Sequence, residues 1–229
     1  GMTYIYDRDD MYTENFWNTV NPLRLPGTTV AAMKIDNGAP DSSGFIQKGD
    51  FLSTESWVGG SSIGNYGISG MAFSGKIKGA EGDASTTYAP ELNGKKSWFM
   101  FDDEIVCLGA DINNKNMNVP VETTIDNRKL DQDGNNGFLV DGQEMDLPVK
   151  EANVKELADR SVDVSGVACE DIRWAHVEGT ESAGTGYYFP EENTEIQVRR
   201  AKTTGSWRDI GTFDGESTEN YLEMWFDHG

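Results

Sequence analysis

Histidine and cysteine, which often perform catalysis, are scarce in this sequence, and their spacing fits no catalytic arrangement. The histidines are His176 and His228. His176 lies beside Trp174 in an alternating apolar pattern, where a histidine ordinarily packs in a sheet or lies at its rim. We predict neither a nucleophile elbow nor a Ser-His-Asp site.

The sequence also gives no support for a metal-binding site. Cys107 and Cys169 lack metal-ligand spacing, and the sequence leaves open whether they form a disulfide or stay as two thiols. Residues 131–137, DQDGNNG, resemble the start of a calcium loop. However, Asn136 occupies the glycine position of that loop and Gly142 occupies its glutamate position. We predict a hairpin turn at 131–137, and no metal or cofactor in the chain.

Acidic residues and glycines also fail to define a site. The chain has 39 acidic residues, and no pair is singled out by its neighbours as a general acid and base. The glycine-rich stretch 59–75 has no Gly-Lys-Ser/Thr ending and no predicted helix after it, so we interpret it as a turn and a strand. Judged by its candidate catalytic and metal-binding residues alone, the chain is typical of a binding or supporting module.

Charge narrows the choice of partners. The formal net charge is −20 at pH 7. Nucleic acids and anionic membranes need a basic face, so we predict neither as a partner. No apolar run approaches the roughly 20 residues of a membrane span, and no signal peptide is recognisable. Because of the way the sequence starts and stops, we expect a piece of a larger protein.

The longest strand-like stretch is Lys95–Ile112, KKSWFMFDDEIVCLGADI. Apolar side chains in both of its registers predict a strand covered on both faces, as in the middle of a sandwich. Asp102–Glu104 interrupts it and marks either a bend at the rim or a polar network. Residues 119–130 alternate, and we expect them to pair antiparallel with 95–112 through the loop 113–118.

Other segments complete an all-β pattern. We expect short strands at 86–88, 138–140, 162–176, 186–190, 196–202, 205–207 and 221–226. The best helix candidate is Lys150–Asp159. About a dozen strands at such spacing predict an antiparallel sandwich rather than βαβ units, in a single domain over residues 1–229.

Residues 22–29, PLRLPGTT, predict a rigid loop. Pro22 and Pro26 restrict φ, and Pro26-Gly27 is a type II turn signal. Arg24 lies between the prolines, and rigid loops hold functional side chains well. The preceding aromatic stretch, residues 4–24, either forms a contact surface or covers the core of this domain.

Several segments, taken in order, resemble the central β domain of family 8 polysaccharide lyases, which include hyaluronate, chondroitin AC and xanthan lyases. They are FWNTVNPLRLPGTTV (16–30), ESWVGG (55–60), KSWFMFDDEIVCLGADI (96–112), VETTIDNRKL (121–130), GYYFP (186–190), GSW (205–207) and WFDHG (225–229). The resemblance covers nearly the whole chain. LPGTT together with SWFMFDDEIVxLG is its most specific part, and TVNP with LPGTTV is closest to the hyaluronate lyases.

The resemblance implies a fold, a parent enzyme and a partner. The fold is an antiparallel β-supersandwich of the galactose-mutarotase-like type, here without the N-terminal α/α toroid and small C-terminal β domain of the family. The parent is a secreted or cell-surface lyase that cuts uronate-containing polysaccharides of the hyaluronan or chondroitin type by β-elimination. In the family an asparagine neutralises the uronate, and a histidine and a tyrosine with a nearby arginine move protons. Those groups lie in the toroid, so we carry over no catalytic residue and expect this chain to be inactive alone. We expect it to pack on the toroid and to form one wall of the cleft that binds the acidic polysaccharide.

The resemblance also suggests substrate-binding candidates. Asn21, Arg24 and Trp17 are placed where the rigid loop would present them to the cleft; the alternative for Arg24 is a carboxylate partner inside the domain or at the toroid contact. Chondroitin AC relatives hold calcium near LPGTT through acidic side chains. The corresponding positions here are Asn21, Leu23 and Ala31, which argues against that metal.

Two other interpretations of the sequence remain. The chain is a non-catalytic carbohydrate-binding module if its aromatic residues stack on sugar rings. It is a structural surface protein if the parent has no toroid.

Overall fold

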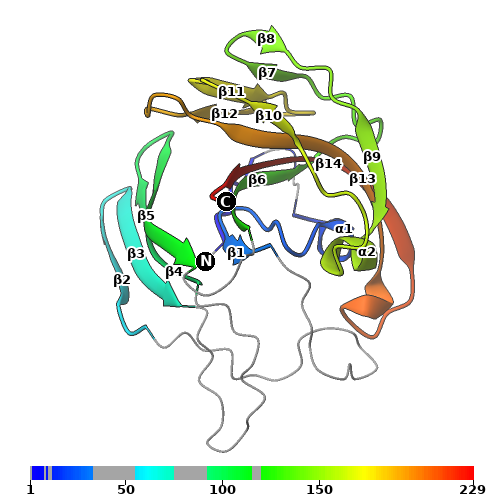
Figure 1. Ribbon diagram of the computed structural model, residues 1–229, viewed down its shortest axis with the longest axis horizontal. Helices are drawn as coiled ribbons and strands as arrows, with labels where there is room; N and C mark the ends of the chain where they lie inside the picture. Colours follow the sequence, from blue (N-terminus) through cyan, green and yellow to red (C-terminus); the bar gives the residue numbers. More distant parts are fainter. Residues whose placement is uncertain (1, 8, 10–11, 33–54, 75–91, 115–119) are drawn as a thin grey trace, which may run out of the picture. The chain divides into compact units, whose positions relative to one another are not determined.

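The computed structural model describes residues 2–7, 9, 12–32, 55–74, 92–114 and 120–229 (Figure 1). Contacts divide the chain into two compact units. Unit 1 comprises Gly1–Phe45 and Glu122–Gly229, and unit 2 comprises Ile46–Val121. The expectation of a single domain over 1–229 stays a prediction.

Unit 1 is built around a six-stranded sheet. Its path is β1 (Thr29–Ala31), β6 (Val121–Lys129), β14 (Glu216–Asp227), β13 (Ile196–Ser206) and β10 (Val167–Cys169). The sixth strand, β9 (Val149–Asn153), also pairs with β13, and this pairing is parallel. The long β13–β14 and β14–β6 pairs are antiparallel, as alternating segments with short connections predict.

A second sheet covers one face of the first, as Figure 1 shows for β7, β11 and β12. Its order is β12 (Thr185–Tyr188), β11 (Trp174–Val177), β7 (Phe138–Val140) and β8 (Gln143–Glu144). The apolar core lies between the sheets. Its buried residues are Leu130, Phe138, Val140, Leu147, Cys169, Ile172, Ala175, Val177, Phe189, Ile196, Val198, Leu222 and Met224. Period-two alternation places these side chains on facing surfaces, and burying them drives the two sheets together.

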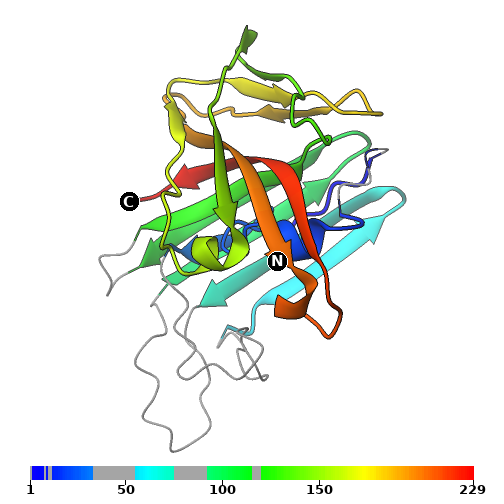
Figure 2. The same cartoon turned by 90° about the vertical axis from the view of Figure 1, so that its right-hand side faces the viewer.

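The N-terminal segment covers the opposite face of the six-stranded sheet, and Figure 2 shows its short helix α1 (Phe16–Thr19) beside β13 and β14. A small apolar cluster forms this contact; its buried members are Tyr12, Phe16, Val20, Ala201 and Tyr221. The side-chain amide of Asn18 donates to the Gly205 carbonyl at 3.1 Å. A Cβ atom at Gly205 would overlap the backbone of Asn18, so the close approach requires glycine.

Two short helices connect strands of unit 1. Helix α2 (Val154–Ala158) begins with a capping box between Asn153 and Glu156. The 3-10 helix η2 (Trp207–Asp209) follows β13 directly. The predicted helix at 150–159 is therefore half right, because its first residues belong to β9. The predicted strand at 205–207 is wrong beyond Ser206, where the chain turns into η2.

Unit 2 is a four-stranded antiparallel sheet in simple order. Its strands are β2 (Val58–Ile63), β3 (Tyr66–Ser74), β4 (Leu92–Met100) and β5 (Ile105–Asn114). β2 and β3 form a hairpin through Gly64, whose φ of 59° suits glycine. The turn and strand predicted within 59–75 are therefore both present.

The stretch 95–112 is two strands rather than one. The amide of Phe101 donates to the Glu104 carbonyl at 2.9 Å, and Trp98 pairs with Cys107 across the hairpin. Asp102 and Asp103 lie in the turn, where water solvates their charges. The predicted strand covered on both faces is wrong, since most β5 side chains are exposed, while the predicted bend comes closest to the structure.

Two further pairings differ from expectation. Strand β6 pairs with β14 in unit 1 and not with the 95–112 stretch, because the matching alternation lies about a hundred residues later. Residues 131–137 connect the two sheets of unit 1 and do not close a hairpin between paired strands. The guanidinium of Arg200 caps this loop by donating to the carbonyls of Gly134 and Asn136 at 2.7 and 2.5 Å. The strand expected at 86–88 lies outside the described residues.

Candidate functional site

The loop of residues 22–29 is as rigid as its prolines predict. Gly27 has φ 72°, and the amide of Thr28 donates to the Leu25 carbonyl at 3.0 Å, which closes the predicted turn. The loop is also bonded to β6. The Gly27 amide donates to the Thr124 carbonyl, and the Thr124 amide donates to the Thr28 carbonyl, both at 2.9 Å.

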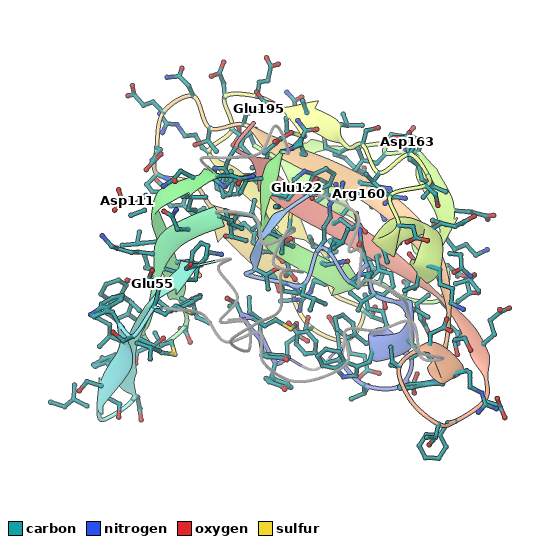
Figure 3. All side chains as sticks on the ribbon, turned by 60° about the horizontal axis from the view of Figure 1, so that its bottom comes forward. Glu55, Asp111, Glu122, Arg160, Asp163 and Glu195 are labelled. Carbon is teal, nitrogen blue, oxygen red and sulfur yellow. The ribbon has the colours of Figure 1, made fainter. Side chains whose placement is uncertain are left out.

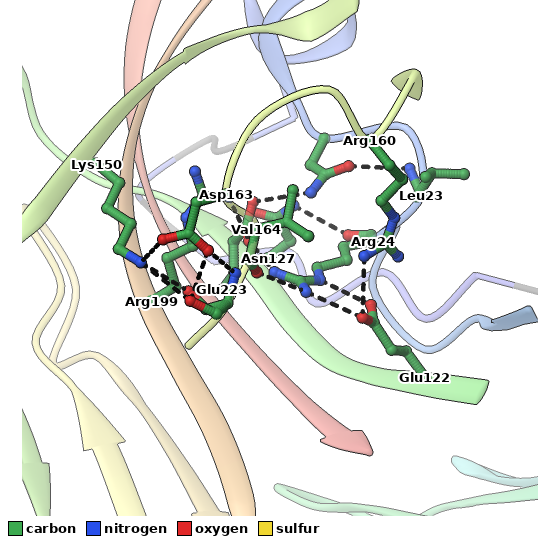
Figure 4. A network of polar contacts seen from close by, with 12 residues as sticks. Leu23, Arg24, Glu122, Asn127, Lys150, Arg160, Asp163, Val164, Arg199 and Glu223 are labelled. Atoms are coloured by element: carbon green, nitrogen blue, oxygen red, sulfur yellow. Dashed lines mark hydrogen bonds and ion pairs between the residues drawn. The ribbon is translucent and has the colours of Figure 1, made fainter. Parts of the chain in front are cut away.

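Five charged side chains beneath this loop form one network, which we call the charge chain: Arg160, Glu122, Arg24, Glu223 and Arg199 (Figure 4). Arg24 is central. Its Nε donates to Glu122 Oε2 at 2.9 Å, and its Nη1 donates to Glu223 Oε2 at 2.7 Å. Nη1 of Arg160 reaches Glu122 Oε1 at 3.3 Å, and Nη1 of Arg199 reaches Glu223 Oε2 at 3.4 Å. Cations and carboxylates alternate from one end to the other.

A β-bulge in β6 brings these groups to one face of the sheet. Asp126 is opposite Met224 and Thr124 is opposite Trp225, so Ile125 is an extra residue in β6. Side chains of a regular strand alternate between its two faces, and the extra residue shifts this alternation by one position. Glu122, which lies before the bulge, can therefore be on the same face as odd-numbered residues after it, toward the N-terminal segment. Figure 3 shows Glu122 beside Arg160 in the interior of unit 1.

Arg24 is fully engaged by its surroundings. Its side chain is 1% exposed, and its guanidinium carbon lies 3.4 Å from the ring centroid of Trp225, a cation–π contact. Its Nη2 donates to Glu122 and to the Val164 carbonyl at 3.1 and 3.0 Å. Burial acts to lower the pKa of Arg24, but the carboxylates of Glu223 and Glu122 outweigh it and raise that pKa. Likewise, burial raises the pKa of Glu122, and Arg24 with Arg160 brings it below its ordinary value.

The structure places the three substrate-binding candidates differently. Arg24 is bonded inside unit 1, so its alternative role as the partner of internal carboxylates is what the structure shows. Asn21 is buried: its amide donates to Glu223 at 3.2 Å, and its oxygen accepts from the Leu23 amide at 3.1 Å. Trp17 is 40% exposed. Substrate contact by Asn21, Arg24 and Trp17 stays a prediction, and of the three only Trp17 has substantial exposed surface.

Trp17 belongs to an aromatic cluster formed by Tyr4, Tyr6, Tyr12, Phe16 and Trp17. Buried Phe16 contacts Tyr12 and Trp17 edge-to-face, each at 5.1 Å between ring centroids. Tyr4 and Tyr6 lie outside, nearly parallel at 13° and 6.1 Å apart. Tyr6 is 76% exposed. Of the two roles predicted for the aromatic stretch, the inner rings cover the core, and the outer rings leave an aromatic surface.

A second polar cluster lies on the other face of β6. The hydroxyl of Tyr187 donates to Asp126 at 2.5 Å, and Arg128 contacts both Asp126 and Asp7. Burial raises the pKa of Asp126 against the opposing effect of Arg128, and burial and Asp126 raise the pKa of Tyr187 well above its ordinary value. Since each group is bonded to another member, the cluster fastens the N-terminal segment and β12 to β6.

In the part of the chain that the structure describes, the remaining candidates for chemistry have contacts that are typical of structural side chains. Nε2 of His176 lies 3.2 Å from the Ala183 carbonyl, and Nε2 of His228 lies 2.8 Å from Thr123 Oγ1. The letters G-x-S-x-G do occur once, at 60–64, but they span β2 and a hairpin turn, so they form no strand-to-helix elbow. Within the described residues no group of three His, Cys, Asp or Glu side chains could hold a metal. Cys107 and Cys169 are thiols and form no disulfide.

Comparisons with known proteins place this architecture in a defined class. Residues 1–229 match the family model described as polysaccharide lyase family 8, super-sandwich domain. The chain is 38% identical to a xanthan lyase of Bacillus sp. (strain GL1) over 236 residues, which cover 100% of this chain and 21% of that protein. It is 33% identical to a hyaluronate lyase of Thermasporomyces composti over 234 residues, covering 100% and 25%.

Solved structures agree. A Paenibacillus xanthan lyase has a TM-score of 0.71 at 32% identity and covers 100% of this chain and 19% of its own. The Streptomyces coelicolor A3 chondroitin AC lyase, in complex with chondroitin sulphate, has a TM-score of 0.58 at 29% identity, covering 97% and 23%.

The chain belongs to polysaccharide lyase family 8, and its predicted fold, an antiparallel β-supersandwich, is confirmed. It spans about a fifth to a quarter of the length of these relatives. The relatives include both xanthan and hyaluronate lyases, so the identities do not separate their substrates.

Sequence reasoning missed the carboxylates of the charge chain. Glu223 stands between Tyr221 and Trp225 on one face of a strand whose neighbours are apolar. A single acid on such a face needs a cation, and this signal pointed to an arginine such as Arg24. No comparable signal identified Glu122, because the bulge decides on which face of the sheet its side chain lies.

Proposed function

We propose that this chain is the supporting β domain of a lyase that cuts uronate-containing polysaccharides of the hyaluronan or chondroitin type by β-elimination. It braces the catalytic toroid, forms one wall of the substrate cleft and is inactive alone. Family membership and the names of the relatives support the substrate class. The observation that carries the supporting role is the charge chain, because its carboxylates and central arginine bind one another and none of them is left to act as a general acid or base.

In this proposal the predicted substrate-binding residues share the work unequally. Trp17, with its exposed ring, contacts the polysaccharide, since sugar rings stack on aromatic faces. Arg24 and Asn21 act through the loop by holding it on Glu122 and Glu223. They are positioning residues.

An assay of this chain and of the whole parent protein tests the proposal. Hyaluronan and chondroitin are incubated with each, and the absorbance of the unsaturated product is recorded. We expect turnover by the parent and none by this chain. Turnover by this chain alone contradicts the supporting role, and a parent without turnover on any uronate polysaccharide contradicts the substrate class.

We also propose that the parent acts outside the cell or on its surface. Polysaccharide substrates are too large to cross a membrane unaided, which supports this location. No helix among the described residues is long and apolar enough to span a membrane. Activity found only in the cytoplasmic fraction of the source cells would contradict the location.

The aromatic cluster favours a second candidate function, a carbohydrate-binding module. Tyr4, Tyr6 and Trp17 present exposed rings over a packed base, and their hydroxyl and indole groups can bond to sugar hydroxyls. Calorimetry with hyaluronan, chondroitin and xanthan tests whether this chain binds a polysaccharide as a module, without the rest of the parent protein. Binding by this chain that is lost in Tyr6→Ala but kept in Phe213→Ala, an exposed aromatic outside the cluster, supports a module. Absence of binding disposes of it.

A further inference from the structure

Unit 2 carries a lysine and a cysteine next to each other on one face of its sheet. The register of β2, β3, β4 and β5 places residues opposite one another in rows across the four strands. One row is Val58, Met71, Lys96 and Gly109, and the next row on the same face is Gly60, Ser69, Trp98 and Cys107. Lys96 and Cys107 are therefore diagonal neighbours, with Cβ atoms typically about 7 Å apart and within reach of a long side chain. The other six residues of these two rows carry no charge.

The two members of this pair have different environments. Lys96 is buried, at 7% exposed, whereas Cys107 is exposed. Burial lowers the pKa of Lys96 to about 8, and the charge of the Cys107 thiolate acts to raise it. Lys96 is therefore still mainly protonated at pH 7. A poorly solvated positive charge thus lies beside a thiol that solutes can reach.

An ammonium group in this position changes the chemistry of the thiol. The thiolate is the form that attacks disulfides, and a lysine beside a cysteine favours the thiolate. The interaction is reciprocal, so the thiolate that favours the protonated form of Lys96 is itself favoured by that form. Burial strengthens the effect, because water screens the charge of a buried ammonium less than that of an exposed one. Cys107 therefore has the two properties of a reactive cysteine, a positive neighbour and exposure.

Cys169, the second cysteine of the chain, provides the contrast. It is 6% exposed and lies in the apolar core of unit 1. Burial raises the pKa of its thiol, so the thiol stays protonated at neutral pH and is expected to be inert. One chain therefore contains both a reactive and an unreactive cysteine, and each can be measured in the same sample.

We propose that Cys107, activated by Lys96, is a modification site that exchanges with small disulfides. The Cys107 thiolate attacks one sulfur of a disulfide R–S–S–R. The S–S bond of that molecule breaks, a new bond forms between Cys107 Sγ and one S–R group, and the other S–R group leaves with the electron pair as a thiolate. Cys107 is oxidised and the leaving sulfur is reduced, so the small disulfide is itself the oxidant. This inference does not depend on the proposed function.

The measurement is the rate at which cystine modifies each cysteine at pH 7. The chain is incubated with cystine, quenched with acid and digested, and mass spectrometry follows the mixed disulfide at Cys107 and at Cys169. The same measurement is made in urea, where both cysteines are exposed and Lys96 is no longer held beside Cys107. We expect Cys107 to react much faster than Cys169 in the native chain, and faster than Cys107 itself does in urea. In urea the two cysteines should react at similar rates.

Matched variants test the role of Lys96. Lys96→Met should slow the reaction of Cys107 about threefold at pH 7 and move its half-maximal rate to higher pH, because fewer thiols are ionised. Lys95→Met is the control, since Lys95 lies on the opposite face of β4 and pairs with Asp111. It should leave the rate unchanged.

Two outcomes overturn the proposal. One is a native chain in which Cys107 reacts no faster than Cys169, and the other is a Cys107 rate and pH profile that Lys96→Met leaves unchanged. Circular dichroism shows whether Lys96→Met is folded. If it is not, the comparison of Cys107 in the native chain and in urea decides, and a native rate no higher than the rate in urea overturns the proposal.

Discussion

The two faces of the six-stranded sheet in unit 1 are buried by different physical means. One face packs against a second sheet through apolar side chains such as Phe138, Leu222 and Met224. The other lies under the N-terminal segment, where Arg24 and Glu223 lie among aromatic rings. Consecutive residues of the same strands supply both faces, since Leu222 and Met224 flank Glu223.

The two faces should respond differently to amino-acid substitutions. Apolar contacts are non-directional, so a smaller side chain loses stability in proportion to the area and volume removed. An ion network is less tolerant, because removing one partner leaves a buried charge behind. We therefore expect the apolar face to supply the larger part of the stability and the charged face to fix where the N-terminal segment lies.

Phe138→Ala should have the largest effect. Phe138 is fully buried between the two sheets, and its loss removes apolar contacts and leaves a cavity. We expect a loss of about 4 kcal/mol in the free energy of unfolding, measured by urea denaturation. Phe213→Ala is the control, since that ring is 75% exposed, and it should change stability by less than about 0.5 kcal/mol. Similar losses for both would show that the assigned core does not hold unit 1 together.

Glu223→Gln should have the next largest effect. The glutamine keeps the shape but leaves Arg24 and Arg199 with less compensating charge, for an expected loss of about 3 kcal/mol in the same urea experiment. Glu195→Gln, which removes an exposed carboxylate that accepts a hydrogen bond from Gln197, is the control. A double variant with Arg199→Met should recover part of the loss. A neutral result for Glu223→Gln would show that the charged face contributes no more than a solvated surface.

Gly205→Ala tests the close approach of the N-terminal segment. A methyl group there overlaps the backbone of Asn18, which cannot move as freely as a flexible side chain. We expect a loss of about 2 kcal/mol in unfolding free energy. Gly186→Ala on β12 is the matched strand control, because a Cβ there meets nothing within 4 Å. Equal effects at the two positions would indicate that α1 is not packed on β13 in solution.

The two faces also differ in how much the sequence revealed. The apolar face follows mainly from alternation, which predicts the strands at 196–202 and 221–226, while the strand at 138–140 is predicted because it follows the turn at 131–137. The rigid loop was predictable because Pro26-Gly27 has a single preferred geometry. These signals come from neighbouring residues, so they can be recognised in a single sequence.

The features that could not be predicted from the sequence depend on pairing between residues that are far apart in the chain. The β6–β14 partnership and the bulge at Ile125 decide which residues face Arg24, and no local pattern encodes either. In the sequence, the hairpin at Asp102 has the pattern of an interrupted strand because both of its arms are apolar. The sequence leaves open whether Arg24 contacts the substrate or a carboxylate inside the domain, because its two carboxylate partners are 98 and 199 residues away.

Acid titration separates the two faces with the smallest perturbation. The pKa of Glu122 is below its ordinary value of 4.5, so its pairing stabilises the fold above that pH and is lost as the pH falls through the folded-state pKa. The pKa of Asp126, on the other face, is above its ordinary value of 3.8, so this group acts in the opposite direction and favours the fold as it is protonated. Unfolding free energies measured between pH 5.5 and 3 should therefore fall less steeply in Glu122→Gln than in the unaltered chain. In Asp126→Asn they should fall more steeply, since a group that opposes the loss of stability in acid is gone. Parallel pH profiles for all three proteins would mean that neither carboxyl is held by its face of the sheet in the way the contacts indicate.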